Sequence, residues 1–179
     1  MSTLPNRHIS LGCLEIGPAE RRYVNDVLDS DRLSYGKYTR RFEQTFARAH
    51  GVRHAIMMNS GTSALQVALA ALKEAGGWSD GDEVIVPAVT FIATSNIVLM
   101  NGLVPVFVDV DQQTYNLDPR KLEPKLTPKT RAILPVHLCG LPCDMDPILE
   151  VARRHDLKVL EDSCETMFAR YRNRPVGSF

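Results

Sequence analysis

The sequence has no excess of charge of one sign, because 21 Lys and Arg residues balance 21 Asp and Glu residues. A basic surface for nucleic acid or membranes is therefore not indicated. Long hydrophobic runs are also missing: the longest apolar stretch, near Ile97–Met100, is far too short to span a bilayer, and the first residues contain no apolar segment typical of a signal peptide. We expect a soluble, cytoplasmic protein that binds small molecules, with no nucleic-acid or membrane partner.

Cysteine is scarce as well. The chain has four cysteines, and none forms a C-x-x-C pair or has a nearby histidine that would complete a zinc pattern. Free thiols in a reducing compartment are the expectation, and no metal site is predicted. The residues concerned are Cys13, Cys139, Cys143 and Cys164.

What is present is a regular alternation of short apolar runs and helix-like segments after position 54. Runs such as Val84-Ile85-Val86 are apolar without alternation, which is typical of strands covered on both faces. The pattern predicts an α/β fold, a three-layer arrangement around a mostly parallel sheet. Strands are predicted at 54–59, 83–87, 104–109, 131–136 and 157–161, and helices at 18–30, 39–50, 62–75, 90–101, 119–126 and 145–155; 168–175 is expected to be a connection.

The small polar residues Ser60-Gly61-Thr62-Ser63 stand between an apolar run and an alanine-rich helix. The N–H groups and the dipole at such a helix start can hold a phosphate. No Walker A loop or G-x-G-x-x-G fingerprint is found in the sequence. An ordinary N-cap by Ser or Thr explains the same residues about equally well.

Asp162 follows the apolar run Leu157–Leu160, at the strand end where α/β sheets place ligands. An aspartate there can hold a protonated pyridine nitrogen, which makes the ring an electron sink; the alternative is a capping aspartate. Glu161 is expected to face away or to cap a neighbouring element. Glu165 either hydrogen-bonds a ring substituent or is solvated.

Two ring side chains also follow predicted strands. Phe91 comes just after the strand that ends at Pro87 and is placed to cover a flat heterocycle, although taken singly an aromatic residue there more often belongs to the core. His137 follows the apolar run Ile133–Val136. It is a candidate for contact with a substrate or cofactor, and a satisfied structural histidine is the equal alternative.

Together these segments resemble the DegT-type (DegT/StrS) family of pyridoxal-phosphate-dependent sugar aminotransferases, matching its N-terminal portion in order over nearly the whole chain. The matching segments are Glu20–Gly36, Ser60–Leu65, Pro87–Thr94, Pro105–Asp111, Pro135–Gly140, Leu160–Glu165 and Val176–Phe179.

The resemblance implies the large domain of a fold-type I enzyme, with an N-terminal helix and turn at 1–36 and a partial cofactor-binding domain at 37–179. It implies pyridoxal 5′-phosphate or pyridoxamine 5′-phosphate as cofactor, a nucleotide-linked keto sugar and an amino donor such as glutamate as substrates, and a homodimer at full length. The implied cofactor-binding residues are Gly61, Thr62, Ser63, Phe91, Asp162 and Glu165, with His137 as a candidate substrate contact. Glu165 departs from the family pattern, where many relatives have Gln or His.

The resemblance places the family's Schiff-base lysine beyond Phe179, so no catalytic residue is assigned within the sequence. We expect the chain to be truncated before the last strands and the small C-terminal domain, and to be inactive alone. Aminotransferase is the preferred reaction. The alternatives are a pyridoxamine-phosphate-dependent 3-dehydratase of nucleotide sugars, which the same family contains, and a non-catalytic remnant that still binds cofactor.

Overall fold

The computed structural model describes residues 14–179, so Cys13 lies outside the described residues. The chain divides into two compact units, one ending at Arg40 and the other comprising Arg41–Phe179. The first unit contains helix α1 (Pro18–Leu28), with proline in its first turn. The Gly17 N–H donates to Glu20 Oε2 at 2.8 Å, which closes a capping box at the start of this helix.

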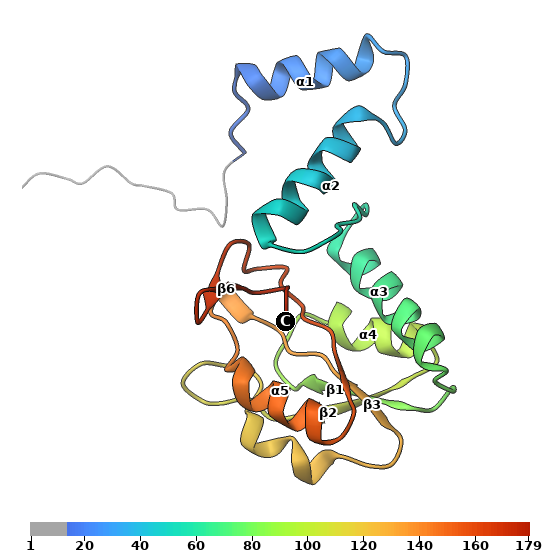
Figure 1. Ribbon diagram of the computed structural model, residues 1–179, viewed down its shortest axis with the longest axis vertical. Helices are drawn as coiled ribbons and strands as arrows, with labels where there is room; N and C mark the ends of the chain where they lie inside the picture. Colours follow the sequence, from blue (N-terminus) through green and yellow to red (C-terminus); the bar gives the residue numbers. More distant parts are fainter. Residues whose placement is uncertain (1–13) are drawn as a thin grey trace, which may run out of the picture. The chain divides into compact units, whose positions relative to one another are not determined.

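The second unit is built on a four-stranded parallel sheet with the strand order β2-β1-β3-β4 (Figure 1). Its strands are β1 (Glu83–Pro87), β2 (Val104–Val108), β3 (Thr130–Ile133) and β4 (Lys158–Val159). A parallel bridge between Val136 and Asp162 continues the pairing of β3 and β4 past their ends. A separate antiparallel hairpin joins β5 (Arg170–Tyr171) to β6 (Arg174–Pro175).

Helices cover both faces of this sheet, which gives three layers (Figure 1). On one face, α3 (Gly61–Gly76) and α4 (Ala93–Met100) pack their apolar side chains on Val84 and Val86. On the other, α5 (Met145–Arg154) packs on Ile85. Since successive strand residues face opposite sides, a continuous apolar strand is what a doubly covered sheet requires.

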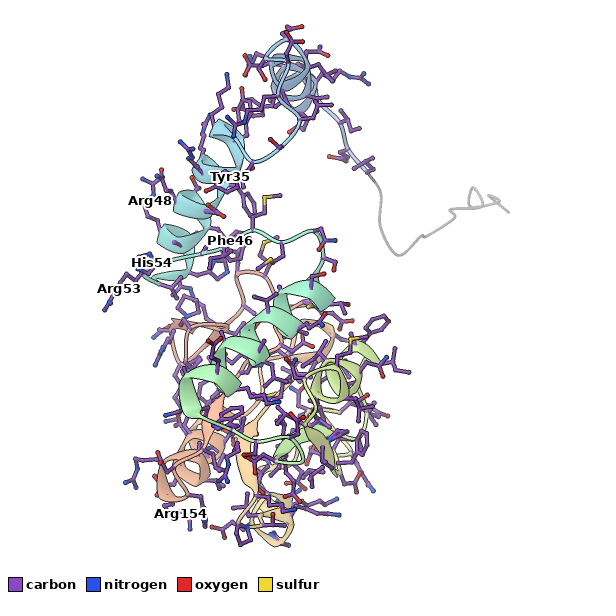
Figure 2. All side chains as sticks on the ribbon, turned by 90° about the vertical axis from the view of Figure 1, so that its right-hand side faces the viewer. Tyr35, Phe46, Arg48, Arg53, His54 and Arg154 are labelled. Carbon is purple, nitrogen blue, oxygen red and sulfur yellow. The ribbon has the colours of Figure 1, made fainter. Side chains whose placement is uncertain are left out.

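Helix α2 (Lys37–His50) begins in the first unit and ends in the second. Phe46 and Arg48 project from opposite sides of it (Figure 2). On the Phe46 side, the Phe46 ring stacks on His50 at 4.1 Å between centroids, and His50 stacks on Phe168 at 5.3 Å. These ring contacts attach the last turns of α2 to the loop before β5.

Most predicted elements are confirmed, and two predictions were wrong. Residues 54–59 form no strand, because no strand of the described chain pairs with them, and Ile56 is 75% exposed there. Residues 119–126 form two short 3-10 helices, η1 (Pro119–Lys121) and η2 (Glu123–Lys125), instead of one α-helix. Pro124 inside that segment lacks the N–H that a continuous helix needs.

The remaining differences are small. Residues 168–175 contain the β5–β6 hairpin, whose turn residues Arg172 and Asn173 both have positive φ, as a tight two-residue hairpin turn demands.

Among the described residues, no helix is both long and apolar enough to cross a membrane.

Candidate functional site

A pocket of about 420 Å³ opens at the carboxyl ends of the strands, where α3, the segment before α4 and the segment after β4 meet. It brings together five of the seven residues that the sequence nominated. Its lining residues are Gly61, Thr62, Leu65, Phe91, Ala93, Val136, Leu138, Asp162, Cys164 and Glu165. Ser63 and His137 are not part of this lining.

The N-terminus of α3 forms one end of the pocket. Ser60 is its N-cap: its Oγ accepts the Ser63 N–H at 3.1 Å and donates to Ser63 Oγ, also at 3.1 Å. The ordinary N-cap interpretation of this turn is therefore correct for Ser60. The N–H groups of Gly61 and Thr62 come before the first intrahelical bond, which Ala64 makes to the Ser60 carbonyl. They leave a site of positive potential at the pocket.

Gly61 allows the segment after β4 to come close to this helix start. A Cβ built on Gly61 would lie 2.8 Å from Cys164 Sγ, a separation that real Cβ atoms essentially never show. A Cβ at position 61 therefore requires the Cys164 side chain to shift. Glycine lets the helix N-terminus and the loop that carries Asp162 meet with the Cys164 side chain where it is.

Asp162 supplies a buried carboxylate, with 5% of its surface exposed. Its Oδ2 accepts the Thr94 hydroxyl at 3.1 Å, and its Oδ1 accepts the Cys164 N–H at 3.2 Å. Burial, followed by a side-chain hydrogen bond to Asp162, raises the pKa of the Cys164 thiol to about 12. Cys164 is therefore a neutral thiol near neutral pH and does not add a second negative charge beside Asp162.

Phe91 and Glu165 border the pocket in different ways. The Phe91 side chain is 70% exposed, while the Thr94 N–H donates to the Phe91 carbonyl at 3.1 Å, so one turn presents the ring outward and Thr94 inward. Glu165 Oε2 accepts the N–H of Cys139 at 2.7 Å. Because Cys139 has a left-handed φ of 51°, this bond holds a turn that is costly for a residue other than glycine.

His137 is fully buried, and both of its ring nitrogens have partners within the chain. Nδ1 accepts the Cys143 N–H at 3.0 Å, so the neutral ring carries its proton on Nε2 and donates it to Glu161 Oε2 at 3.0 Å. This arrangement matches the structural alternative for His137. A contact between His137 and a substrate stays a prediction.

Sequence reasoning missed the roles of Thr94 and Glu161. Glu161 faces inward: its side chain is 4% exposed, and besides His137 it accepts the N–H groups of Gly177 at 2.7 Å and Phe179 at 2.6 Å. Thr94 is a fully buried polar residue on the first turn of α4, while its polar neighbours Ser95 and Asn96 are half-buried. Its burial appears only in the structure, so no sequence signal distinguished it from Ser95 and Asn96.

Other sites are less suitable for an anion. A cavity of about 760 Å³ borders Arg120 and Arg154, but Arg120 is paired with Asp118 and Arg154 with Glu123. Within residues 14–179, no group of three or more His, Cys, Asp or Glu side chains could hold a metal ion.

The fold and the pocket define a class: an α/β domain whose pocket at the carboxyl ends of parallel strands combines a helix N-terminus, an aromatic side chain and a buried carboxylate. Comparison with known proteins gives the family. Residues 14–179 match the DegT/DnrJ/EryC1/StrS aminotransferase family, and the chain belongs to it.

Individual relatives agree with this assignment. GDP-perosamine synthase of Caulobacter vibrioides is 50% identical over 179 residues, which cover 99% of this chain and 47% of that protein. The structure of S. venezuelae DesV in complex with a ketimine intermediate has a TM-score of 0.83 and 42% identity, covering 89% of this chain and 42% of DesV. The E. coli GDP-4-keto-6-deoxy-D-mannose-3-dehydratase with bound hydrated PLP has a TM-score of 0.89 and 36% identity, and the match covers 94% of this chain and 44% of the dehydratase. The chain thus spans less than half the length of these relatives.

Proposed function

We propose that this chain provides the cofactor-binding part of a pyridoxal-phosphate- or pyridoxamine-phosphate-dependent enzyme that transfers an amino group to a nucleotide-linked keto sugar. The observation that carries the proposal is one pocket that joins the free N–H groups of Gly61 and Thr62 to the buried carboxylate of Asp162. The donor set fits the cofactor: amide donors suit its phosphate, and an anionic acceptor suits its protonated ring nitrogen.

Each residue then has a defined task. Gly61 and Thr62 bind the phosphate through their N–H groups, and Ser63 adds its hydroxyl proton, which its bond from Ser60 does not use. Phe91 covers one face of the ring and limits access of water. Asp162 accepts the proton on the ring nitrogen, and Glu165 lies at the ring edge. When bound, the cofactor supplies an electron sink for removal of a proton next to nitrogen.

The substrate part of the proposal rests on the relatives. Half of the residues are identical to GDP-perosamine synthase, so a GDP-linked 4-keto sugar is the first acceptor to test, with glutamate as amino donor. The Schiff-base lysine lies outside the sequence in this proposal, and the complete enzyme is a cytoplasmic homodimer. The 179-residue chain alone binds cofactor but does not complete the transfer.

A 3-dehydratase reaction is the second candidate. The dehydratase structure superimposes with a TM-score of 0.89, against 0.83 for DesV, although its sequence identity is lower, 36% against 42%. Because fold similarity follows the backbone and not the reacting side chains, we keep aminotransferase as the primary proposal. A non-catalytic cofactor-binding remnant is the third possibility.

Cofactor binding is tested by equilibrium dialysis with pyridoxamine 5′-phosphate, which has no aldehyde and cannot form adventitious imines with surface lysines. Asp162→Asn removes the anionic acceptor, and hydrogen bonds to charged groups contribute about 1.5–3 kcal/mol. We expect the affinity to fall roughly 10- to 100-fold. The matched control is Asp156→Asn, because Asp156 is exposed and its positive φ of 51° suits asparagine. Equal affinity of the Asp162→Asn variant and the unmodified chain would contradict the site.

The reaction is tested with a protein of the full length of its relatives. It is incubated with a GDP-linked 4-keto-6-deoxy sugar and glutamate, and products are separated by mass. An amino sugar supports transamination, and loss of the 3-hydroxyl supports the dehydratase. Cofactor binding without either product supports the remnant.

A further inference from the structure

Two threonine hydroxyls form a chain that ends on Asp162. Thr94, on the first turn of α4, is fully buried and donates its hydroxyl proton to Asp162 Oδ2 at 3.1 Å. Thr90 Oγ1 lies 2.9 Å from Thr94 Oγ1. Since the single proton of Thr94 is directed at the carboxylate, Thr90 is the donor in the second bond. The order of donation is therefore Thr90 to Thr94 to Asp162.

The opposite oxygen of Asp162 is held by the next loop. Oδ1 accepts the Cys164 N–H at 3.2 Å. A carboxylate has about four lone-pair positions. With the hydroxyl and the amide in place, about two positions stay open, of which a donor from the pocket needs one.

The same turn also places the aromatic residue of the site. The N–H of Thr94 bonds to the carbonyl of Phe91, so the orientation of Thr94 and the path of the Phe91 backbone are linked. Thr94 thus connects two groups that act on a planar ring: the carboxylate at its edge and the aromatic side chain at its face.

We infer that Thr94, supported by Thr90, is a positioning residue that holds the Asp162 carboxylate in the rotamer that receives a protonated ring nitrogen. The inference deepens the proposed function and rests on it. Without the hydroxyl, Asp162 can rotate about its side-chain bonds, and the open lone pair no longer faces the ring. The affinity for the ring nitrogen then falls, while the phosphate contacts at the N-terminus of α3 stay intact.

The test compares two ligands on the same variants by equilibrium dialysis. One ligand is pyridoxamine 5′-phosphate, and the other is its 1-deaza analogue, which keeps the phosphate but has carbon in place of the ring nitrogen. Thr94→Val keeps the side-chain shape and removes the hydroxyl. We expect this variant to bind pyridoxamine 5′-phosphate about tenfold more weakly and the deaza analogue within about twofold of the unmodified chain.

Three further variants complete the design. Thr94→Ser restores the hydroxyl and should recover affinity to within about twofold. Thr90→Val removes the outer donor and should weaken binding about threefold, which keeps the test decisive if Thr94→Val does not fold. The matched control is Thr130→Val, because Thr130 is 4% exposed and donates to Glu83 Oε2 at 3.1 Å at the other end of the strands. It should change the affinity for neither ligand.

The outcomes separate the two claims. If the unmodified chain does not bind pyridoxamine 5′-phosphate, this result contradicts both the proposed function and the role of Thr94. If the unmodified chain binds pyridoxamine 5′-phosphate, and Thr94→Val and Thr90→Val bind it with the same affinity as the unmodified chain, only the positioning role is overturned. A parallel loss for both ligands would also overturn it, because that result indicates general damage to the pocket.

Discussion

A methyl group at position 61 tests the close contact between the start of α3 and the loop after β4. The added Cβ would lie 2.8 Å from Cys164 Sγ, where repulsion is strong. Overpacking of a fitted contact costs about 1–3 kcal/mol. We expect Gly61→Ala to lower the free energy of unfolding by about 1 kcal/mol in urea titrations, the low end of that range, because the exposed Cys164 side chain can rotate away. Helix propensity alone predicts the opposite sign, because alanine favours a helix over glycine by about 1 kcal/mol.

A double variant assigns the loss to this contact. Cys164→Ala removes the sulfur that the new methyl group meets, so Gly61→Ala should cost little in that background, with a coupling energy of about 1–2 kcal/mol. Gly36→Ala is a control, because its Cβ would lie 3.6 Å from the nearest atom, the Ser34 carbonyl oxygen. Unchanged or increased stability of Gly61→Ala in the natural background would refute the reasoning.

Three other predictions follow from buried polar groups. Glu161→Ala removes the acceptor of the buried His137 Nε2–H and of the N–H groups of Gly177 and Phe179, and should lower the free energy of unfolding by about 2 kcal/mol in urea titrations. Alkylation at pH 8, mapped by mass spectrometry, should modify Cys139 well before Cys164, although both residues are exposed, because burial of the Cys164 thiol raises its pKa to about 12. The hydrogen bond from Arg131 lowers the pKa of Asp82 below 3.8. The ionised Asp82 carboxylate therefore stabilises the fold above that pH, and this contribution is lost as the pH falls through the lowered pKa.

Each of these has a control and a contrary result. Glu150→Ala removes only exposed ion pairs and should cost less than about 1 kcal/mol; equal losses for Glu161→Ala and Glu150→Ala would contradict the buried network. Equal alkylation rates for Cys139 and Cys164 would contradict the raised thiol pKa. In Asp82→Asn, the free energy of unfolding should fall less steeply as the pH is lowered from about 5 to 2. An unchanged pH dependence would contradict the contribution of the Asp82 carboxylate.

The sheet and the main site residues could be predicted because their signals are local. A run such as Val84-Ile85-Val86 indicates a strand covered on both faces, and the end of such a strand indicates where a ligand lies. Asp162 and Phe91 were found in this way, and the structure places both at one pocket. Residues 54–59 carried a similar apolar signal, but a strand also needs a partner strand, which a local pattern cannot specify.

The supporting contacts could not be predicted because they join residues far apart in sequence. Thr94 and Asp162 are 68 positions apart, and His137 and Glu161 are 24 apart. The contact of Gly61 with Cys164 likewise exists only after α3 and the loop after β4 have packed. Glu161 was expected to face away or to cap a neighbouring element, and its inward orientation follows from donors at Gly177 and Phe179 that no local pattern connects to it.

The most direct test of the account is a titration of the isotopically labelled chain with pyridoxamine 5′-phosphate, followed by amide nitrogen–proton NMR spectra. If the ring lies between the α3 N-terminus and the carboxylate after β4, the largest shift changes occur together at the amides of Gly61, Thr62 and Cys164. Changes centred instead on the cavity beside Arg120 and Arg154, with those three amides unaffected, would contradict the central claim.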